Sequence, residues 1–475
     1  MADCPSCGRE FQLTPEGNPF CPECRLSASQ AQERRSRTFA DYYHRFPATI
    51  ILIAVNLLVF VAMLLGHVSA TGPTIDQLIR WGGDSGDKVL LHNQWWRIVT
   101  AAFVHIGAAH LIMNMWALWV LGTLAEAVLG TYLYVGIYFV CAIAGSLASL
   151  YWNPGLAGAG ASGAIMGILG AEVSVLKFAR LPLPKEVLRS TLRSLVQGAV
   201  LTLVIGLLPR IDNAAHVGGL ACGLFIGLLL SLTRRADYTR QRPLRQICLL
   251  APFALMVPLA LAVQKHGEPR VHLQEAEEEL GASHYDQAER EARIALRHLP
   301  DQENVLAVLS AALYYQGNDA EAGKYLRQLL AHNPRSEFAV NTLALIELKN
   351  NDAIGARDLL INALAQQPRN AYGEFYLGTA LQTLNADDQA IAHYRKALQI
   401  DPQMYEANMA LAWVFEKQDR PQDAIALYQK ATQIRPSEVE PLRGLARCYR
   451  AAGMTVQADQ TLAEIQKRVQ ATGNR

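Results

Sequence analysis

The chain has 475 residues, of which 51% are hydrophobic, and its formal net charge is +1. This length allows two or three domains, and a charge so close to zero gives no reason to expect a nucleic-acid partner. The average hides two unlike parts, because residues 47–263 are apolar runs between short charged loops, whereas residues 271–475 are rich in Ala, Leu, Gln and charge. The N-terminus lacks a basic region followed by an apolar run, so we expect no cleaved signal peptide.

Four cysteines near the N-terminus stand in two C-x2-C pairs, Cys4 with Cys7 and Cys21 with Cys24. Two such pairs can place four thiolates tetrahedrally around one zinc ion, and a segment this short cannot fold on its own core. Residues 1–25 resemble a zinc ribbon, which implies a closed, structural zinc site; a disulfide pair or a redox C-x-x-C is the alternative. Reduced thiolates would also place the N-terminus in the cytoplasm.

A basic linker at 26–46 leads into a series of apolar runs. The first run is Ala48–Leu65, and a long loop at 66–100 follows it. The later runs lie at about 103–124, 131–151, 159–176, 187–208, 214–232 and 246–263. Each run has close to the ~20 residues that cross a bilayer as a helix. The last run contains Pro252 and Pro258, whose freed backbone groups a neighbouring helix could satisfy.

The positions of Lys and Arg orient these helices, because loops rich in basic residues stay on the cytoplasmic side. The loops assigned to the inside hold Arg34, Arg35, Arg37 and Arg45, then Lys177, Arg180 and Lys185, then Arg234, Arg235, Arg240, Arg242 and Arg245. The loops assigned to the outside hold Arg80, Lys88, Arg97 and Arg210. We therefore expect the N-terminus inside, and seven crossings would leave the C-terminus outside.

With this topology the second, fourth and sixth helices all begin at the outer face, and each carries polar residues near its start. These are His110 and Asn114 on the second helix, Ser162 on the fourth and His216 on the sixth. A single intramembrane Ser is usually a packing residue, but three helices that supply such groups at one depth favour a functional site. A Ser hydroxyl needs a base to become a nucleophile, and His is suited to that role near neutral pH.

Glycines surround Ser162 and recur on the sixth helix. Gly158, Gly160 and Gly163 form a G-x-G-x-x-G pattern, but a dinucleotide site requires a preceding strand in a soluble βαβ unit, so we reject it. Small residues one turn apart instead predict close helix packing in a membrane, here between the fourth and sixth helices. The residues concerned are Gly163 and Gly167 on the fourth helix, and Gly219, Gly223 and Gly227 on the sixth.

These motifs resemble those of rhomboid intramembrane serine proteases over about residues 47–235. The matching motifs are Trp96-Arg97, His110-x-x-x-Asn114, Glu126-x-x-x-Gly130, Gly160-Ala161-Ser162-Gly163 and Ala215-His216-Val217-Gly218-Gly219-x-x-x-Gly223. The resemblance implies that Ser162 is the nucleophile and His216 its general base. It also implies that His110, Asn114 and the backbone N–H of Ser162 are oxyanion donors, which stabilise the charged tetrahedral intermediate.

One position departs from the family, which often has an aromatic ring four residues after the nucleophile. Met166 stands there, and its thioether could still pack against the base. No carboxylate partner for His216 is evident, since Asp212 lies one turn nearer the surface, so we predict a dyad rather than a triad. We assign structural roles to three further residues: Trp96, Arg97 and His105.

The C-terminal part is an internal repeat of constant period. Prolines recur at Pro300, Pro334, Pro368, Pro402 and Pro436; alanines recur at Ala288, Ala322, Ala356, Ala390, Ala424 and Ala458; small residues recur at Ala276, Ser310, Ala344, Gly378, Ala412 and Ala446. This pattern resembles tetratricopeptide repeats, with six units over about 271–472. The resemblance implies an α-solenoid whose concave groove binds an extended segment or helix of a protein partner; a spacer without a ligand is the alternative.

The sequence therefore predicts a mostly α protein with a small zinc ribbon, a multi-pass bundle of six rhomboid helices plus one extra helix, and an α-solenoid. The expected domains are 1–25, the linker 26–46, the membrane core 47–235, the extra helix 246–263 and the repeats 271–475. We expect a serine endopeptidase of the inner cell membrane that cleaves transmembrane segments of protein substrates and needs no cofactor for catalysis. The alternatives are a non-proteolytic, client-binding adaptor and a metal-responsive membrane scaffold.

Overall fold

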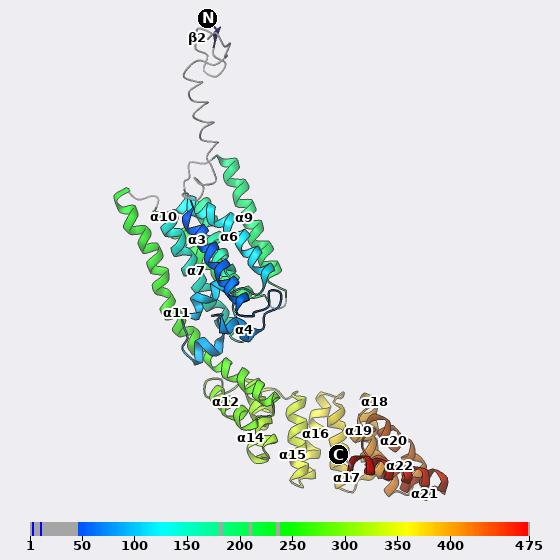
Figure 1. Cartoon of the computed structure of the whole chain (residues 1–475). Helices are drawn as coiled ribbons and strands as arrows, with labels where there is room; N and C mark the ends of the chain where they lie inside the picture. The colour runs from blue at the N-terminus through cyan, green and yellow to red at the C-terminus, as the bar shows by residue number, and fades with distance from the viewer. Residues whose placement is uncertain are drawn as a thin grey trace. The chain divides into compact units, whose positions relative to one another are not determined.

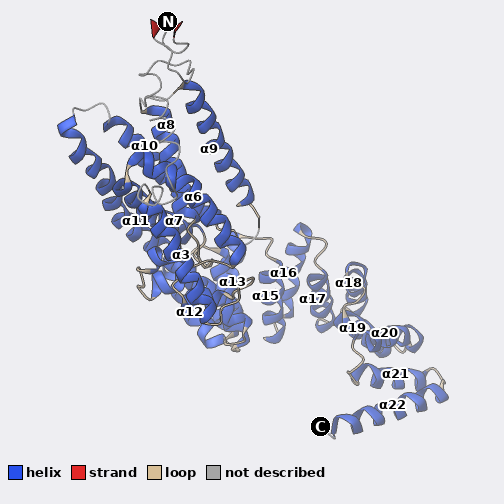
Figure 2. Ribbon diagram, turned by 45° about the horizontal axis from the view of Figure 1, so that its top comes forward, coloured by secondary structure: helices blue, strands red, loops and turns tan. Residues whose placement is uncertain are grey.

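The computed structural model describes residues 2–3, 10–11, 46–179, 184–208, 211–233 and 238–473. The chain forms two compact units, Met1–Val271 and His272–Arg475. Apart from the two-residue strands β1 (Ala2–Asp3) and β2 (Glu10–Phe11), which pair antiparallel, the described elements are helical (Figure 2). Cys4, Cys7, Cys21 and Cys24 lie outside the described residues, so the zinc ribbon stays a prediction.

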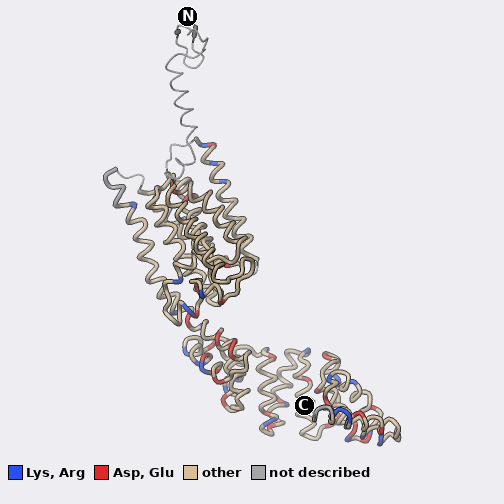
Figure 3. Tube along the Cα trace, in the orientation of Figure 1, with Lys and Arg blue, Asp and Glu red and all other residues tan. Residues whose placement is uncertain are grey.

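The first unit is a bundle of long helices (Figure 1). They are α3 (Pro47–Leu65), α6 (Ala108–Leu129), α7 (Thr131–Trp152), α8 (Ser162–Phe178), α9 (Lys185–Ile205), α10 (Asn213–Thr233) and α11 (Tyr238–Gly281), whose residues from His272 onward belong to the second unit. In the described part of the chain, six helices are long and apolar enough to cross a membrane: α3, α6, α7, α9, α10 and the Leu244–Gly281 part of α11. Lys, Arg, Asp and Glu are scarce along the bundle helices and frequent in the repeats (Figure 3).

Two helices differ from the predicted boundaries. α6 begins at Ala108 rather than at about 103, because Gly107 has a left-handed φ of 89° and the Ala108 N–H donates to the Ala70 carbonyl. α11 continues through Pro252 and Pro258 and on to Gly281, whereas the sequence predicted a helix that ends at about 263. A proline inside a helix removes one N–H donor and crowds the carbonyl of residue i−4. In a membrane helix, neighbouring helices and local adjustments can satisfy the freed backbone groups.

α8 and α10 pack with their backbones in contact, as the small residues predicted. A Cβ at Gly219 would lie 2.0 Å from the Gly163 carbonyl oxygen, and a Cβ at Gly223 would lie 1.8 Å from the Gly167 carbonyl oxygen. Any side chain at these two positions would force the helices apart. The same approach brings the first turn of α10 beside the start of α8.

A buried carboxylate joins three helices at the other end of the bundle. Glu126, near the end of α6, accepts hydrogen bonds from the backbone N–H groups of Ala48 and Thr49 at the start of α3, at 3.1 and 3.0 Å. It also accepts the Thr131 hydroxyl at the start of α7, at 2.8 Å. The first N–H groups of a helix have no partner within that helix and favour negative charge, so Glu126 caps α3.

The long loop between α3 and α6 contains short helices and is held by Arg97. These helices are α4 (Ile75–Arg80), the π-helix η1 (Asp87–Leu91), α5 (Arg97–Thr100) and the 3-10 helix η2 (Ala101–Phe103). The buried Arg97 guanidinium donates to the carbonyls of Ile79 and Gly83, and it lies 4.5 Å from the centre of the Trp96 ring. These contacts agree with the structural role assigned to this pair.

The second unit consists of antiparallel helix pairs. After the end of α11 these are α12 (Tyr285–His298), α13 (Glu303–Tyr315), α14 (Asp319–His332), α15 (Glu337–Lys349), α16 (Ala353–Gln366), α17 (Ala371–Thr383), α18 (Asp387–Ile400), α19 (Tyr405–Lys417), α20 (Pro421–Ile434), α21 (Glu440–Ala451) and α22 (Thr455–Gly473). The periodic alanines from Ala288 to Ala458 are all 0% exposed, because they lie where paired helices touch. The predicted repeat period therefore corresponds to one helix pair.

Candidate active site

The turn before α8 presents Ser162 at the first residue of the helix. Gly160 has a φ of 133°, a conformation that a residue with a Cβ rarely adopts, and Ala161 is the N-cap residue. Ser162 therefore lies where the unpaired N–H groups of the helix start and the positive end of its dipole are found. This position suits a nucleophile whose reaction creates negative charge.

His216 meets Ser162 across the contact between α8 and α10. Its Nε2 atom lies 2.9 Å from Ser162 Oγ, and its side chain is buried in the first turn of α10. The two residues are 54 positions apart in the sequence, and the glycine packing between their helices brings them together. A hydroxyl and an imidazole at hydrogen-bond distance have the geometry of a nucleophile and its base.

His110 and Asn114 lie one turn apart on α6, beside the Gly160 turn. A Cβ at Gly160 would lie 2.6 Å from His110 Cε1 and 3.5 Å from Asn114 Nδ2. Asn114 is 6% exposed, and its Nδ2 atom is buried without a hydrogen-bond partner in the described part of the chain. An amide donor left unpaired beside the nucleophile's turn is available to a developing oxyanion.

The dyad stays a prediction, and the surroundings of His216 bear on it as follows. His216 Nδ1 is buried and has no hydrogen-bond partner within the described ranges. Asp212 Oδ1 accepts the Ala215 N–H at 3.1 Å, so this carboxylate caps the start of α10. Met166 packs in an apolar cluster with Leu195 and Ala199 of α9.

His105 lies in the loop just before α6 and is fully buried. Its ring centre lies 5.4 Å from that of His110, and burial lowers the pKa of His105 to about 4. The side chain is therefore neutral near pH 7 and packs behind His110, in agreement with the structural role assigned to it.

Asp84 is the polar residue beside the site that the sequence analysis missed. It lies in the long loop, is 1% exposed and lines a cavity of about 40 Å³ together with Ser162, Ser146 and Asp212. An Asp in a loop is usually solvated, so nothing in the local sequence indicated its burial. The pair Gly82-Gly83 before it marks a turn, which is the one signal that the backbone there is constrained.

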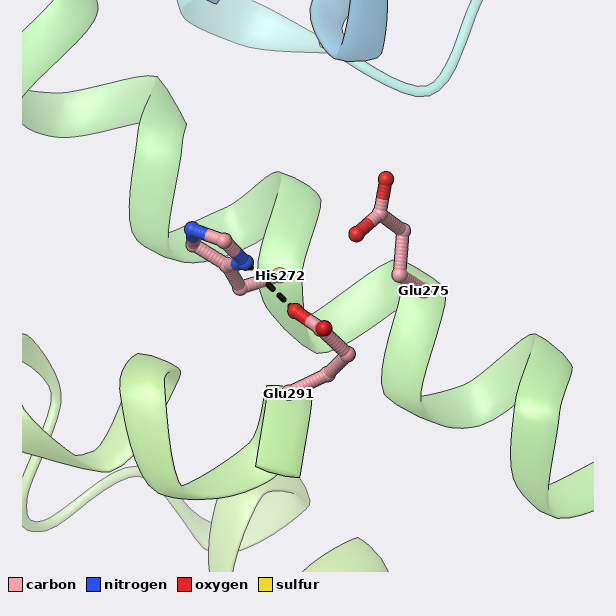
Figure 4. A group of neighbouring side chains, drawn as sticks. All are labelled: His272, Glu275 and Glu291. Atoms are coloured by element: carbon pink, nitrogen blue, oxygen red, sulfur yellow. Dashed lines mark hydrogen bonds and ion pairs between the residues drawn. The ribbon is translucent and has the colours of Figure 1, made fainter. Parts of the chain in front are cut away.

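A separate group of possible metal ligands lies in the second unit. His272 and Glu275 are one turn apart on α11, and Glu291 faces them from α12 (Figure 4). One ligand atom of each lies within 4.8 Å of the others, and His272 Nδ1 lies 2.7 Å from Glu291 Oε2. The ion pair between His272 and Glu291 accounts for this arrangement, so we assign no ion to it.

Comparisons with known proteins agree with two of the three resemblances, those of the membrane unit and of the repeats. The family described as Rhomboid domain matches residues 92–233, which contain His110, Asn114, Ser162 and His216. Two tetratricopeptide-repeat families match residues 341–405 and 415–473. The resemblances to rhomboid proteases and to tetratricopeptide repeats are thereby confirmed, and the zinc ribbon stays a prediction.

Three relatives illustrate the range of similarity. Rhomboid protease GluP of Bacillus subtilis (strain 168) is 26% identical over 347 residues, which are 73% of this chain and 60% of GluP. Rhomboid protease AarA of Providencia stuartii is 31% identical over 201 residues, 38% of this chain and 71% of AarA. RHOMBOID-like protein 6, mitochondrial, of Arabidopsis thaliana is 34% identical over 172 residues, 36% of this chain and 55% of that protein. These relatives and the apolar helices indicate a multi-pass membrane protein.

Proposed function

The chain belongs to the rhomboid family, and we propose that it is an intramembrane serine endopeptidase that hydrolyses peptide bonds in or beside transmembrane segments of other proteins. The observation that carries the proposal is the 2.9 Å contact between Ser162 Oγ and His216 Nε2 at the meeting of two helix starts. The relatives GluP and AarA bear the name rhomboid protease, which supports the reaction class.

In the proposed mechanism the Ser162 hydroxyl donates its hydrogen bond to neutral His216 and attacks the carbonyl carbon of the scissile bond. His216 takes the proton as general base and then returns it to the leaving amine as general acid. Asn114 Nδ2, His110 and the Ser162 backbone N–H stabilise the oxyanion of the tetrahedral intermediate. A water molecule then releases the acyl group from Ser162 by the same steps.

We also propose an orientation in which the N-terminus is cytoplasmic and the repeats are extracytoplasmic. The distribution of Lys and Arg supports it. The groove of the repeats would then face the same compartment as Ser162 and could bind the outer part of a substrate or a separate protein ligand. A tag after Arg475 should be digested by protease added to spheroplasts; protection until lysis would contradict the orientation.

The four N-terminal cysteines are proposed to bind one structural zinc ion. Their two C-x2-C pairs have the ligand type and spacing of such sites. Purified protein should contain about one zinc per chain, and Cys7→Ser should lose it without loss of proteolysis by the membrane unit. Inhibition of that proteolysis by a chelator would contradict a purely structural role.

The test of the proposed function is cleavage of a transmembrane substrate in liposomes. Wild type should cleave it, and Ser162→Ala should not, because no nucleophile remains. Ser190→Ala is the matched control, since this exposed hydroxyl of α9 donates to the Val187 carbonyl of its own helix. Cleavage by Ser162→Ala at the wild-type rate would contradict Ser162 as the nucleophile. No cleavage by wild type would favour the alternative, a non-proteolytic adaptor that binds membrane clients through the repeats.

A further inference from the structure

Asp84 is joined to the turn that carries Ser162 by a short backbone ladder. The Asp84 N–H donates to the Gly158 carbonyl at 3.0 Å, and the Gly158 N–H donates to the Asp84 carbonyl at 2.9 Å. A Cβ at Gly158 would lie 2.0 Å from Asp84 Oδ1, so only glycine leaves room for this carboxyl group. The long loop is therefore fixed to the segment just before Ser162.

The carboxyl group of Asp84 is enclosed and faces the nucleophile's turn. Both of its oxygens are buried, and neither has a hydrogen-bond partner of normal geometry in the described part of the chain. The cavity of about 40 Å³ that it lines is also lined by Gly160, Ser162 and Gly163. A charge at Asp84 would therefore act on the reacting atoms within a poorly solvated space, where electrostatic effects are strong.

The groups that face Asp84 come from four elements. Asp212 approaches from the start of α10, Arg97 from α5, Ser146 from α7, and Ser162 from α8 with His216 behind it. Burial raises the pKa of Asp84 to about 7; the negative Asp212 raises it too, while Ser146, the Gly158 backbone and Arg97 act in the opposite direction. Both the neutral and the ionised forms of Asp84 are therefore present near pH 7.

The two forms differ in what they do to the proposed reaction. Attack by Ser162 creates an oxyanion on the side of the Gly160 turn where His110 and Asn114 lie. A carboxylate at Asp84, which lines a cavity bordered by Gly160 and Ser162, repels that charge through a poorly solvated space. The neutral carboxyl group has no such effect and can also donate a hydrogen bond into the cavity. Arg97 stabilises the carboxylate form of Asp84 less than Ser146 and the Gly158 backbone do.

We propose that Asp84 is a positioning residue that makes the Ser162 site sensitive to pH: the site turns over substrate when the Asp84 side chain is neutral and is suppressed when it is ionised. This inference rests on the proposed function. The sign follows from the chemistry, because loss of the proton from Asp84 adds the unfavourable charge. Activity therefore falls as pH rises through about 7. Titration of the base, His216, has the opposite effect on activity, because His216 must be neutral to accept a proton and becomes neutral as pH rises.

The test compares pH profiles of cleavage in liposomes for wild type and Asp84→Asn. Asn is a neutral isostere, so the variant should cleave at least as fast as wild type at pH 6 and should lose the decline above pH 7. At pH 9 the variant should exceed wild type by at least tenfold, since the neutral fraction of an acid falls about tenfold per pH unit above its pKa. Asp76→Asn, at an exposed position of α4, is the matched control and should keep the wild-type profile.

Two outcomes would overturn the proposal. One is a pH profile of cleavage that is the same in Asp84→Asn as in wild type, which would mean that Asp84 only holds the long loop to Gly158. The other is a folded Asp84→Asn protein that is inactive at every pH, because a neutral side chain at this position would then not be enough to permit cleavage.

A second measurement does not depend on proteolysis. In Ser162→Ala protein with isotope-labelled aspartate, the infrared band of a neutral carboxyl should be present at pH 5, absent at pH 9, and missing in the Asp84→Asn double variant. A band with that behaviour but no cleavage by wild type would contradict the proposed function alone; absence of the band would contradict the assigned protonation of Asp84.

Discussion

The two units of this chain bury their interiors in different ways. In the membrane unit, α8 and α10 approach through single glycines, and a Cβ at Gly223 would lie 1.8 Å from a backbone carbonyl. In the repeat unit, one alanine in each repeat is fully buried between paired helices, and each pair contacts its neighbours. Close packing in the membrane unit depends on a small residue at each of a few individual positions. In the repeat unit the need for a small residue is shared by six equivalent positions, one in each repeat.

Buried polar groups show the same contrast. In the membrane unit, Asn114 Nδ2 and His216 Nδ1 are buried without partners in the residues described, and so are both oxygens of Asp84. In the repeat unit, the comparable atoms belong to carboxylates whose other oxygen is paired, as in the 2.6 Å ion pair of Asp319 with Lys349. Unpaired buried groups are costly. In the membrane unit some of them lie beside Ser162, while others, such as both carboxyl oxygens of Glu172 on α8, belong to residues outside the proposed site.

The largest expected effect comes from a side chain between α8 and α10. Gly223→Leu should prevent formation of the folded membrane unit, a loss of more than ~3 kcal/mol, because the new atoms would overlap the Gly167 carbonyl. Gly198→Leu on α9 is the matched control, since no atom lies within 4 Å of a Cβ there. Thermal unfolding in detergent measures both, and equal stability of the two variants would contradict the close packing.

The next effect concerns the oxyanion donors. Asn114→Ala should lower kcat on the order of 10²–10³-fold with little change in KM, because the lost hydrogen bond forms only in the transition state. Asn153→Ala, at the exposed end of α7, should leave kcat unchanged. Steady-state kinetics in liposomes test this prediction. A wild-type kcat for Asn114→Ala would show that Asn114 does not donate to the oxyanion.

A substitution in the repeats should have a smaller and local effect. Ala356→Leu places a large side chain at a fully buried position and should destabilise the repeat unit by about 1–3 kcal/mol. Cleavage of a short transmembrane substrate should continue at the wild-type rate, because Ser162 and His216 belong to the other unit. Limited proteolysis and the cleavage assay on one preparation test both statements; a parallel loss of cleavage would show that the units are coupled.

The smallest expected effect lies in the turns between paired helices. Asn351 has a left-handed φ of 63°, and Asn385, one repeat later, has a φ of 60°. Asn385→Gly should change stability by less than ~0.5 kcal/mol, whereas Asn385→Ala should cost about 1 kcal/mol, because a Cβ is strained in this conformation. Chemical denaturation measures the free energy of unfolding of the two variants. Equal values would contradict the explanation that a Cβ is strained at this positive φ.

The helices and the proposed site were largely predictable because their signals are strong in the sequence. Apolar runs of membrane length, the recurring glycines and the constant period of the repeats each follow from one physical requirement. The repeat turns carry a further signal of the same period. The residues with a positive φ there are Ser283, Gly317, Asn351, Asn385, Asp419 and Gly453.

Other features could not be predicted from local patterns. The burial of Asp84 depends on a backbone pairing with Gly158, which lies far along the chain, beyond α6 and α7, and no periodicity reports such a long-range contact. Likewise, α11 passes through four prolines, Pro243, Pro252, Pro258 and Pro269, which a sequence pattern treats as breakers. Both features arise from tertiary packing, which overrides local preference.

The most direct test of the central claim is covalent labelling of the detergent-solubilised protein by a fluorophosphonate, located by mass spectrometry. The account predicts that the label forms on Ser162 in wild type, that His216→Ala lowers the labelling rate by at least about 10³-fold, and that His298→Ala, in the repeat unit, does not. Labelling of Ser162 at the wild-type rate in His216→Ala, or no labelling of Ser162 in active wild type, would contradict the assignment of Ser162 and His216 as nucleophile and base.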